Sequence, residues 1–112
     1  MTASQVISLR QQCDGPRDGA LLRFTLANAL REAGDLPAAI EQFQRAVTFD
    51  PLYSAAWKLL GATCLAAGQH SAAANAWRSG IDAAMQRGDK QAEKEMIVFL
   101  RRLEKAQPGA NR

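Results

Sequence analysis

SAAWKLLGATCLAAGQHSAAANAWRSGIDAAMQR, residues 54–87, contains two stripes of apolar and small residues separated by a break. The first stripe has the spacing of one face of an α-helix and consists of Trp57, Leu60, Gly61 and Cys64. Gly68 and Gln69 interrupt the pattern, as glycine does at helix ends. The second stripe consists of Ala73, Trp77, Gly80 and Ile81. This stretch therefore predicts two helices joined by a short turn.

The same pattern occurs 34 residues earlier in the chain. Its two stripes lie on either side of a break at Gly34 and Asp35, and they consist of Leu26, Ala27 and Leu30, then Ala39, Phe43, Ala46 and Val47. A repeat of about 34 residues built from two helices is the signature of the tetratricopeptide repeat. The chain resembles proteins of that family, among them small bacterial members. The resemblance implies an all-α fold, an α-solenoid of helical hairpins.

A chain of 112 residues is expected to form a single domain. We expect about six antiparallel helices and no strand. A repeat cannot bury its apolar face alone, so helices are expected to cap both ends of the repeats. The expected parts are a capping helix at residues 3–13, repeats at 20–53 and 54–87, a second capping helix at 89–106, and a tail at 107–112.

Short polar residues and glycines predict where the helices begin and end. Asp18 is expected to cap the second helix with its side chain, and Gly34 to close that helix in a left-handed conformation. Met85 stands where the first repeat has Pro51. Because this proline is missing, we expect the fifth helix to continue to Gly88.

Arg23 is the clearest departure from the family pattern, because the second repeat has Trp57 at the equivalent position. A charge at a normally aromatic site must find an acceptor. The candidates nearby in the sequence are Asp14 and Asp18.

Composition argues against several classes of protein. Hydrophobic residues make up 47% and charged residues 22% of the chain, which is typical of a folded globular domain. No apolar run approaches the roughly 18 residues of a membrane span, so we expect no membrane association and a cytoplasmic location. The net charge of +3 is small, and the aromatic side chains of Trp57, Trp77 and Phe43 fall on core stripes. Nucleic-acid binding is therefore not expected.

Catalysis and cofactor binding are not expected either. The chain has one histidine, His70, and two cysteines, Cys13 and Cys64, which do not have the spacing of metal ligands. His70 lies beside Ser71 in a turn, which does not make an oriented nucleophile–base pair. The glycines lie at helix boundaries or on helix faces rather than in a phosphate-binding loop. We expect a protein without metal or cofactor that is not an enzyme.

The resemblance implies where a partner would bind, because in the family the first helix of each repeat lines a concave groove. Its floor would carry Leu21, Phe24, Thr25, Asn28, Arg31, Ala55, Lys58, Leu59, Ala62 and Leu65. We expect Phe24 to act as an apolar anchor, Asn28 to bind a peptide amide, and Arg31 and Lys58 to pair with carboxylates. The alternative is that Phe24 packs against a neighbouring capping helix and that the polar residues form a solvated face.

The sixth helix offers a second candidate surface. Its residues 96–100, MIVFL, are apolar around the whole helix, which argues for burial on more than one side. One stripe is expected to cap the second repeat: Ala92, Met96, Phe99 and Leu103. Ile97 and Leu100, followed by Arg101, then either fill the mouth of the groove or form a second interface.

The sequence therefore predicts a non-catalytic protein–protein interaction module that captures a peptide or helix of a partner protein in its groove. The alternative is a structural module that forms a homodimer through the sixth helix. The identity of the partner does not follow from the sequence.

Overall fold

The computed structural model describes residues 3–106 and contains six α-helices within them. They are α1 (Ala3–Gln12), α2 (Ala20–Glu32), α3 (Leu36–Phe49), α4 (Ser54–Ala66), α5 (His70–Arg87) and α6 (Lys90–Ala106). The described residues include no strand, and the predicted all-α fold is confirmed. The predicted tail at residues 107–112 lies outside the described part of the chain.

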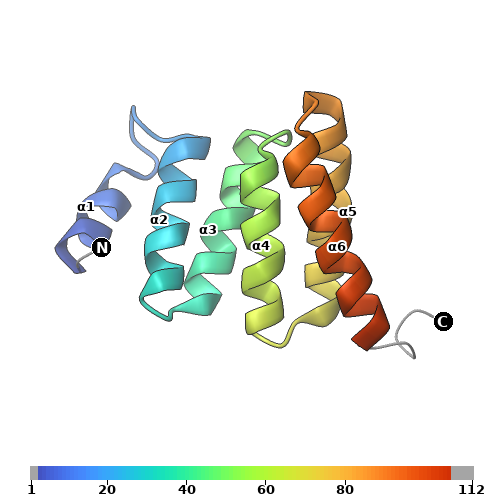
Figure 1. Ribbon diagram of the computed structural model, residues 1–112. Coiled ribbons are helices and arrows are strands. Elements are labelled where there is room, and N and C mark those ends of the chain that lie inside the picture. The colour runs from blue at the N-terminus through green and yellow to red at the C-terminus, as the bar shows by residue number, and fades with distance from the viewer. Residues whose placement is uncertain (1–2, 107–112) are drawn as a thin grey trace.

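The helices stand side by side in two layers (Figure 1). Successive helices form the antiparallel hairpins α2/α3 and α4/α5, and α1 packs against α2 at one end. In Figure 1, α2, α4 and α6 form the layer nearer to the viewer, with α3 and α5 behind. The helix α6 packs on α5 and also contacts α4. It therefore takes the place of the first helix of a third hairpin.

Three glycines close helices in the left-handed region, where a residue without a Cβ is favoured. They are Gly34, Gly68 and Gly88, with φ of 85°, 77° and 74°. The last of them confirms that α5 continues past Met85, and α5 has 18 residues where α3 has 14. As a result α6 begins at Lys90, two residues later than a strict repeat of α4 would place it.

The prediction that Asp18 caps α2 is wrong. The N-cap residue is Gly19, and it makes no side-chain capping bond. The Asp18 carboxylate instead accepts hydrogen bonds from the Gly19 backbone N–H and from the Arg23 guanidinium. A buried cation is a stronger partner for this carboxylate than the amides of the first helical turn.

Trp77 is buried in the core and Trp57 packs against it half-buried, and each has a glycine against it. A Cβ at Gly61 would collide with the indole of Trp77, and a Cβ at Gly80 would lie 2.7 Å from the Cβ of Trp57. The Trp77 indole N–H donates to the backbone carbonyl of Lys58 at 3.1 Å. These glycines therefore let α4 and α5 approach closely enough to bury a full indole ring.

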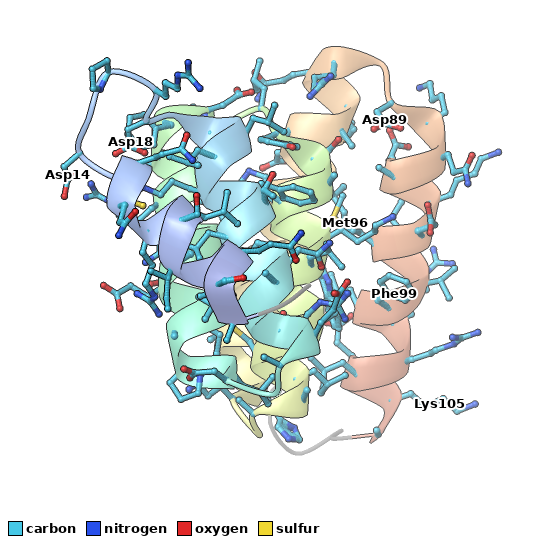
Figure 2. The ribbon with its side chains drawn as sticks, turned by 90° about the vertical axis from the view of Figure 1, so that its left-hand side faces the viewer. Asp14, Asp18, Asp89, Met96, Phe99 and Lys105 are labelled. Atoms are coloured by element: carbon cyan, nitrogen blue, oxygen red, sulfur yellow. The ribbon has the colours of Figure 1, made fainter. Side chains whose placement is uncertain are left out.

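Arg23 is buried, with 5% of its surface exposed, and its guanidinium is surrounded by acceptors. It donates from Nε and Nη2 to both carboxylate oxygens of Asp18, at 2.8 and 2.7 Å. Nη2 also lies 3.3 Å from Oδ1 of Asp14, and Nη1 donates to Oε1 of Gln42 on α3 at 2.9 Å. Both predicted acceptors are confirmed, and Gln42 is an additional one. Figure 2 shows Asp14 and Asp18 together in the connection between α1 and α2, so this network ties that connection to both helices of the first hairpin.

Candidate partner-binding face

The residues predicted to line a groove lie on α2 and α4 and stay outside the buried core. Two of them, Leu21 and Leu65, are 69% and 39% exposed. The other eight are half-buried: Phe24, Thr25, Asn28, Arg31, Ala55, Lys58, Leu59 and Ala62. Together with the adjacent surface of α6, we call this surface the groove face.

Phe24 already has aromatic partners within the chain. Its ring lies edge-on to Phe43, with centroids 5.8 Å apart, and stacks on Tyr53 with centroids 4.9 Å apart. Aromatic pairs at these distances stabilise packing beyond the area that they bury. Phe24 therefore joins the first hairpin to the connection before α4, and part of its ring is unavailable to a partner.

The polar residues of α2 act as a pair. Oδ1 of Asn28 accepts hydrogen bonds from Nε and Nη2 of Arg31, at 3.3 and 3.1 Å. A neutral amide holds the guanidinium in place and leaves its charge uncompensated at that contact. This arrangement presents a positioned cation on the groove face.

A polar hollow of about 230 Å³ lies between the first turns of α4 and α6. Across it, Nζ of Lys58 lies 3.5 Å from a carboxylate oxygen of Glu95. Asp89 borders the hollow, accepts a hydrogen bond from the Ser54 hydroxyl at 2.8 Å and caps α6 through the Ala92 N–H. The bond from Ser54 lowers the pKa of the Asp89 carboxyl. Polar contacts therefore connect α4 and α6 at this end.

A second and apolar cleft of about 400 Å³ lies at the opposite end, between the last turns of α4 and α6 and the start of α5. It is lined by Ala62, Leu65, His70, Trp77, Phe99, Arg102, Leu103 and Ala106. The Trp77 and Phe99 rings lie 5.5 Å apart between centroids. We call this the apolar cleft; it contains two of the predicted groove residues, Ala62 and Leu65.

The sequence predicts that Ile97 and Leu100 of α6 reach the groove, but other residues of α6 line the two cavities. The sequence pattern places Phe99 and Leu103 on a stripe that caps the second repeat, and it does not indicate that Glu95 and Arg102 line cavities. A strict repeat of 34 residues aligns α6 wrongly with α4, because the longer α5 shifts it by two residues. With that shift, Met96 matches Leu60, and both are buried. The extension of α5 past Met85 was the signal from which this alignment could have been found.

The remaining predicted surface lies on α6. The core-facing stripe is confirmed for Ala92, Met96 and Leu103, which are buried. Ile97 and Leu100 are half-buried, and Arg101 is exposed. A second interface at these three residues stays a prediction.

Within residues 3–106, no cluster of three or more histidine, cysteine, aspartate or glutamate side chains could hold a metal ion. Both cysteines are free thiols, and burial raises the pKa of Cys64. Among the described helices, none has the length and apolar character needed to cross a membrane.

Comparison with known proteins places this architecture in a family. The tetratricopeptide repeat model matches residues 20–63. TPR repeat-containing protein PA0015 of Pseudomonas aeruginosa is 54% identical over 89 residues, which cover 80% of this chain and 85% of that protein. The solution structure of protein BPP2914 from Bordetella parapertussis is 41% identical with a TM-score of 0.78, and the match covers 96% of this chain and 92% of that one.

More distant structures share the fold alone. A crystal structure of MamA protein is 20% identical with a TM-score of 0.65, and the match covers 94% of this chain and 63% of that one. The relative at 54% identity and the repeat model agree with the two glycine-closed hairpins seen here. This chain therefore belongs to the tetratricopeptide-repeat family.

Proposed function

We propose that this protein is a non-catalytic interaction module that binds a peptide or a helix of a partner protein on the groove face. Members of the tetratricopeptide-repeat family generally mediate protein–protein interactions. One observation carries the proposal for this chain: a cleft of about 400 Å³ lined mainly by apolar side chains opens on the same face as the predicted groove residues. Surface cavities of this size and lining are typical of binding sites.

The contacts that the groove-face side chains make within the chain indicate which of them are best placed to bind a partner. Arg31 is held by a neutral amide, so it is better placed to pair with a partner's carboxylate than Lys58, which already pairs with Glu95. Leu65 lines the cleft and is 39% exposed, so it offers more apolar surface than Phe24, which packs on Phe43. We therefore propose Leu65 and Arg31 as the main contacts.

The proposal includes a cytoplasmic location. Both cysteines are free thiols, as expected in a reducing compartment.

The test is affinity capture from the native cell lysate, followed by mass spectrometry. The groove variant combines Arg31→Glu with Leu65→Asp, two positions outside the core. The matched control combines Arg45→Glu with Phe49→Asp on α3, where Phe49 is 47% exposed and lies near the Arg45 guanidinium. Each variant reverses one cation and replaces one exposed apolar side chain.

We expect a partner that the wild type and the α3 control retain and the groove variant loses. Equal helicity and melting of the three proteins exclude a folding effect. A partner lost by the α3 control and kept by the groove variant would overturn the proposed site.

A further inference from the structure

We propose that the apolar cleft binds one bulky apolar side chain of an acidic peptide, and that a carboxylate beside that side chain pairs with Arg102. This inference rests on the proposed function and specifies its ligand.

The lining of the cleft selects the apolar part of the ligand. Leu65, Phe99 and Leu103 supply aliphatic and aromatic surface, and the buried Trp77 adds the side of its indole. The volume of about 400 Å³ is large enough for a small ligand and lies near the lower end of the range of about 300–1,000 Å³ for such sites. A single leucine or aromatic side chain fits this description better than an extended polar segment.

Residues 107–112, which follow the cleft in the sequence, do not include such a side chain. Ala106 is the last described residue and lines the cleft. The residues at 107–112 read QPGANR and include no leucine, isoleucine, valine, methionine or aromatic residue. Residues 107–112 therefore do not supply the anchor.

The charge at the mouth of the cleft selects the acidic part of the ligand. Arg102 is exposed and lines the cleft, and no ion pair engages it within residues 3–106. By contrast, Arg78 is matched by Glu104 at 3.7 Å. Lys105 adds a further cation at the same end of α6, and Figure 2 shows its side chain extending away from the helix. A carboxylate next to the anchoring side chain would neutralise this charge.

The same charge disfavours a homodimer in which α6 of a second copy binds at the cleft, parallel to the first α6. Such a copy would bring the same basic last turn, with Arg101, Arg102 and Lys105, against its own equivalent. Like charges in close contact are repulsive at an interface. An acidic peptide does not meet this repulsion.

The two tryptophans provide a test with an internal control. Trp77 lines the apolar cleft and donates its indole N–H to the Lys58 carbonyl. Trp57 donates to the Pro51 carbonyl and lines a different cavity, between α3 and α5. In a ¹⁵N–¹H spectrum of the full chain, the two indole signals report separately on binding at the cleft and on the back layer.

The probe is the acetylated and amidated peptide Asp-Glu-Phe-Asp-Glu. We expect it to shift the Trp77 indole signal and leave that of Trp57 in place. Replacing its phenylalanine with alanine is expected to weaken binding about tenfold, because the apolar anchor is lost. A peptide with lysine at the four acidic positions is also expected to bind more weakly.

Charge reversal tests Arg102 itself. Arg102→Glu is expected to weaken the acidic peptide about fivefold and to strengthen the lysine peptide. Lys94→Glu is the matched control, since Lys94 is an exposed cation on the same helix and does not line the cleft. We expect a change of less than about twofold for this control.

Three results would overturn the inference: an unmoved Trp77 signal at millimolar peptide, equal binding of the lysine peptide, or equal effects of Lys94→Glu and Arg102→Glu. The experiments distinguish an error in assigning the cleft as the binding site from an error in the proposed function. If the peptide or the captured partner shifts backbone signals of Asn28 and Arg31 but not Trp77, the groove face stands and the cleft assignment falls. If the groove variant also keeps its captured partner, the proposed function falls as well.

Discussion

Residues 23 and 57 occupy equivalent positions in the two hairpins, yet one is an arginine and the other a tryptophan. Both side chains bind the connection that precedes their own helix. The Trp57 indole N–H donates to the Pro51 carbonyl at 2.8 Å, and the Arg23 guanidinium donates to the Asp18 carboxylate at 2.7 and 2.8 Å. The equivalent position therefore fastens each helix to the segment before it, and two different chemistries achieve this.

The two solutions differ in what happens when they are broken. Trp57 is half-buried and neutral, and its acceptor is a backbone carbonyl. The side chains of Arg23 and Asp18 are only 6% and 8% exposed and carry opposite charges. Removing one member of a buried ion pair leaves the other charge without compensation. The stability of the first hairpin therefore depends on the ion pair, and that of the second depends mainly on the space that its glycines leave for the indole rings.

The largest effect is expected from Arg23→Met, which keeps the volume and removes the charge. Loss of one partner from a buried pair costs about 3–5 kcal/mol, because the remaining carboxylate stays desolvated. We expect the free energy of unfolding, measured by urea denaturation, to fall by an amount in this range.

The double variant Arg23→Met, Asp18→Asn is the control for this effect. Removing both charges is expected to recover a large part of the stability. A double variant no more stable than the single one would show that packing around Arg23, and not its charge, supports the first hairpin.

The second hairpin is tested by Gly61→Ala. The added Cβ would meet the buried indole of Trp77, and overpacking of this kind costs about 1–3 kcal/mol. The first hairpin has Ala27 and Phe43 at the equivalent positions. Gly61→Ala combined with Trp77→Phe copies that pair, so we expect this double variant to regain part of the loss in thermal melting. An additive loss in the double variant would contradict the idea that the glycine exists to admit the indole.

Helix positions and core residues could be predicted because their signals are local. Gly34 and Gly88 mark helix ends through their own backbone conformation, and Leu60 and Trp77 lie on stripes that any regular helix would bury. The same locality explains one error. Asp18 has the sequence position of a helix cap, but the pairing with Arg23 takes its carboxylate instead.

The candidate site was harder to predict, because it depends on contacts between distant residues. Gln42 binds Arg23 across two helices, and no pattern in the sequence indicates this pairing. The apolar cleft combines Leu65 with Phe99 and Arg102, which are brought together by the two-residue shift of α6. Such a contact depends on the length of α5, and an alignment with a fixed repeat of 34 residues assumes that this length does not change.

The charge-dependent hairpin should also respond to acid. The hydrogen bonds from Arg23 hold the pKa of Asp18 well below its usual range. A carboxyl with a lowered pKa in the folded state contributes fully above its unfolded pKa of about 3.9 and loses this contribution as the pH falls further. We expect wild-type stability, followed by urea denaturation, to fall more steeply below about pH 4 than that of Asp18→Asn. The pKa of Asp89 is also lowered, but Asp89 is present in both proteins, so its contribution cancels in the comparison. Parallel pH profiles of the two proteins would argue against Asp18 as the source of the acid sensitivity.

The smallest effect is expected at the outer acceptor of Arg23. The Asp14 side chain is 82% exposed and lies 3.3 Å from Nη2, so solvent already screens its interaction. Exposed pairs contribute about 0–1 kcal/mol, and Asp14→Ala is expected to lower the free energy of unfolding by no more than this. Asp14 also has a φ of 66°, a conformation that glycine adopts more easily. Asp14→Gly is therefore expected to be at least as stable as Asp14→Ala, and the reverse order in urea denaturation would mean that the turn before α2 relaxes when Asp14 is replaced.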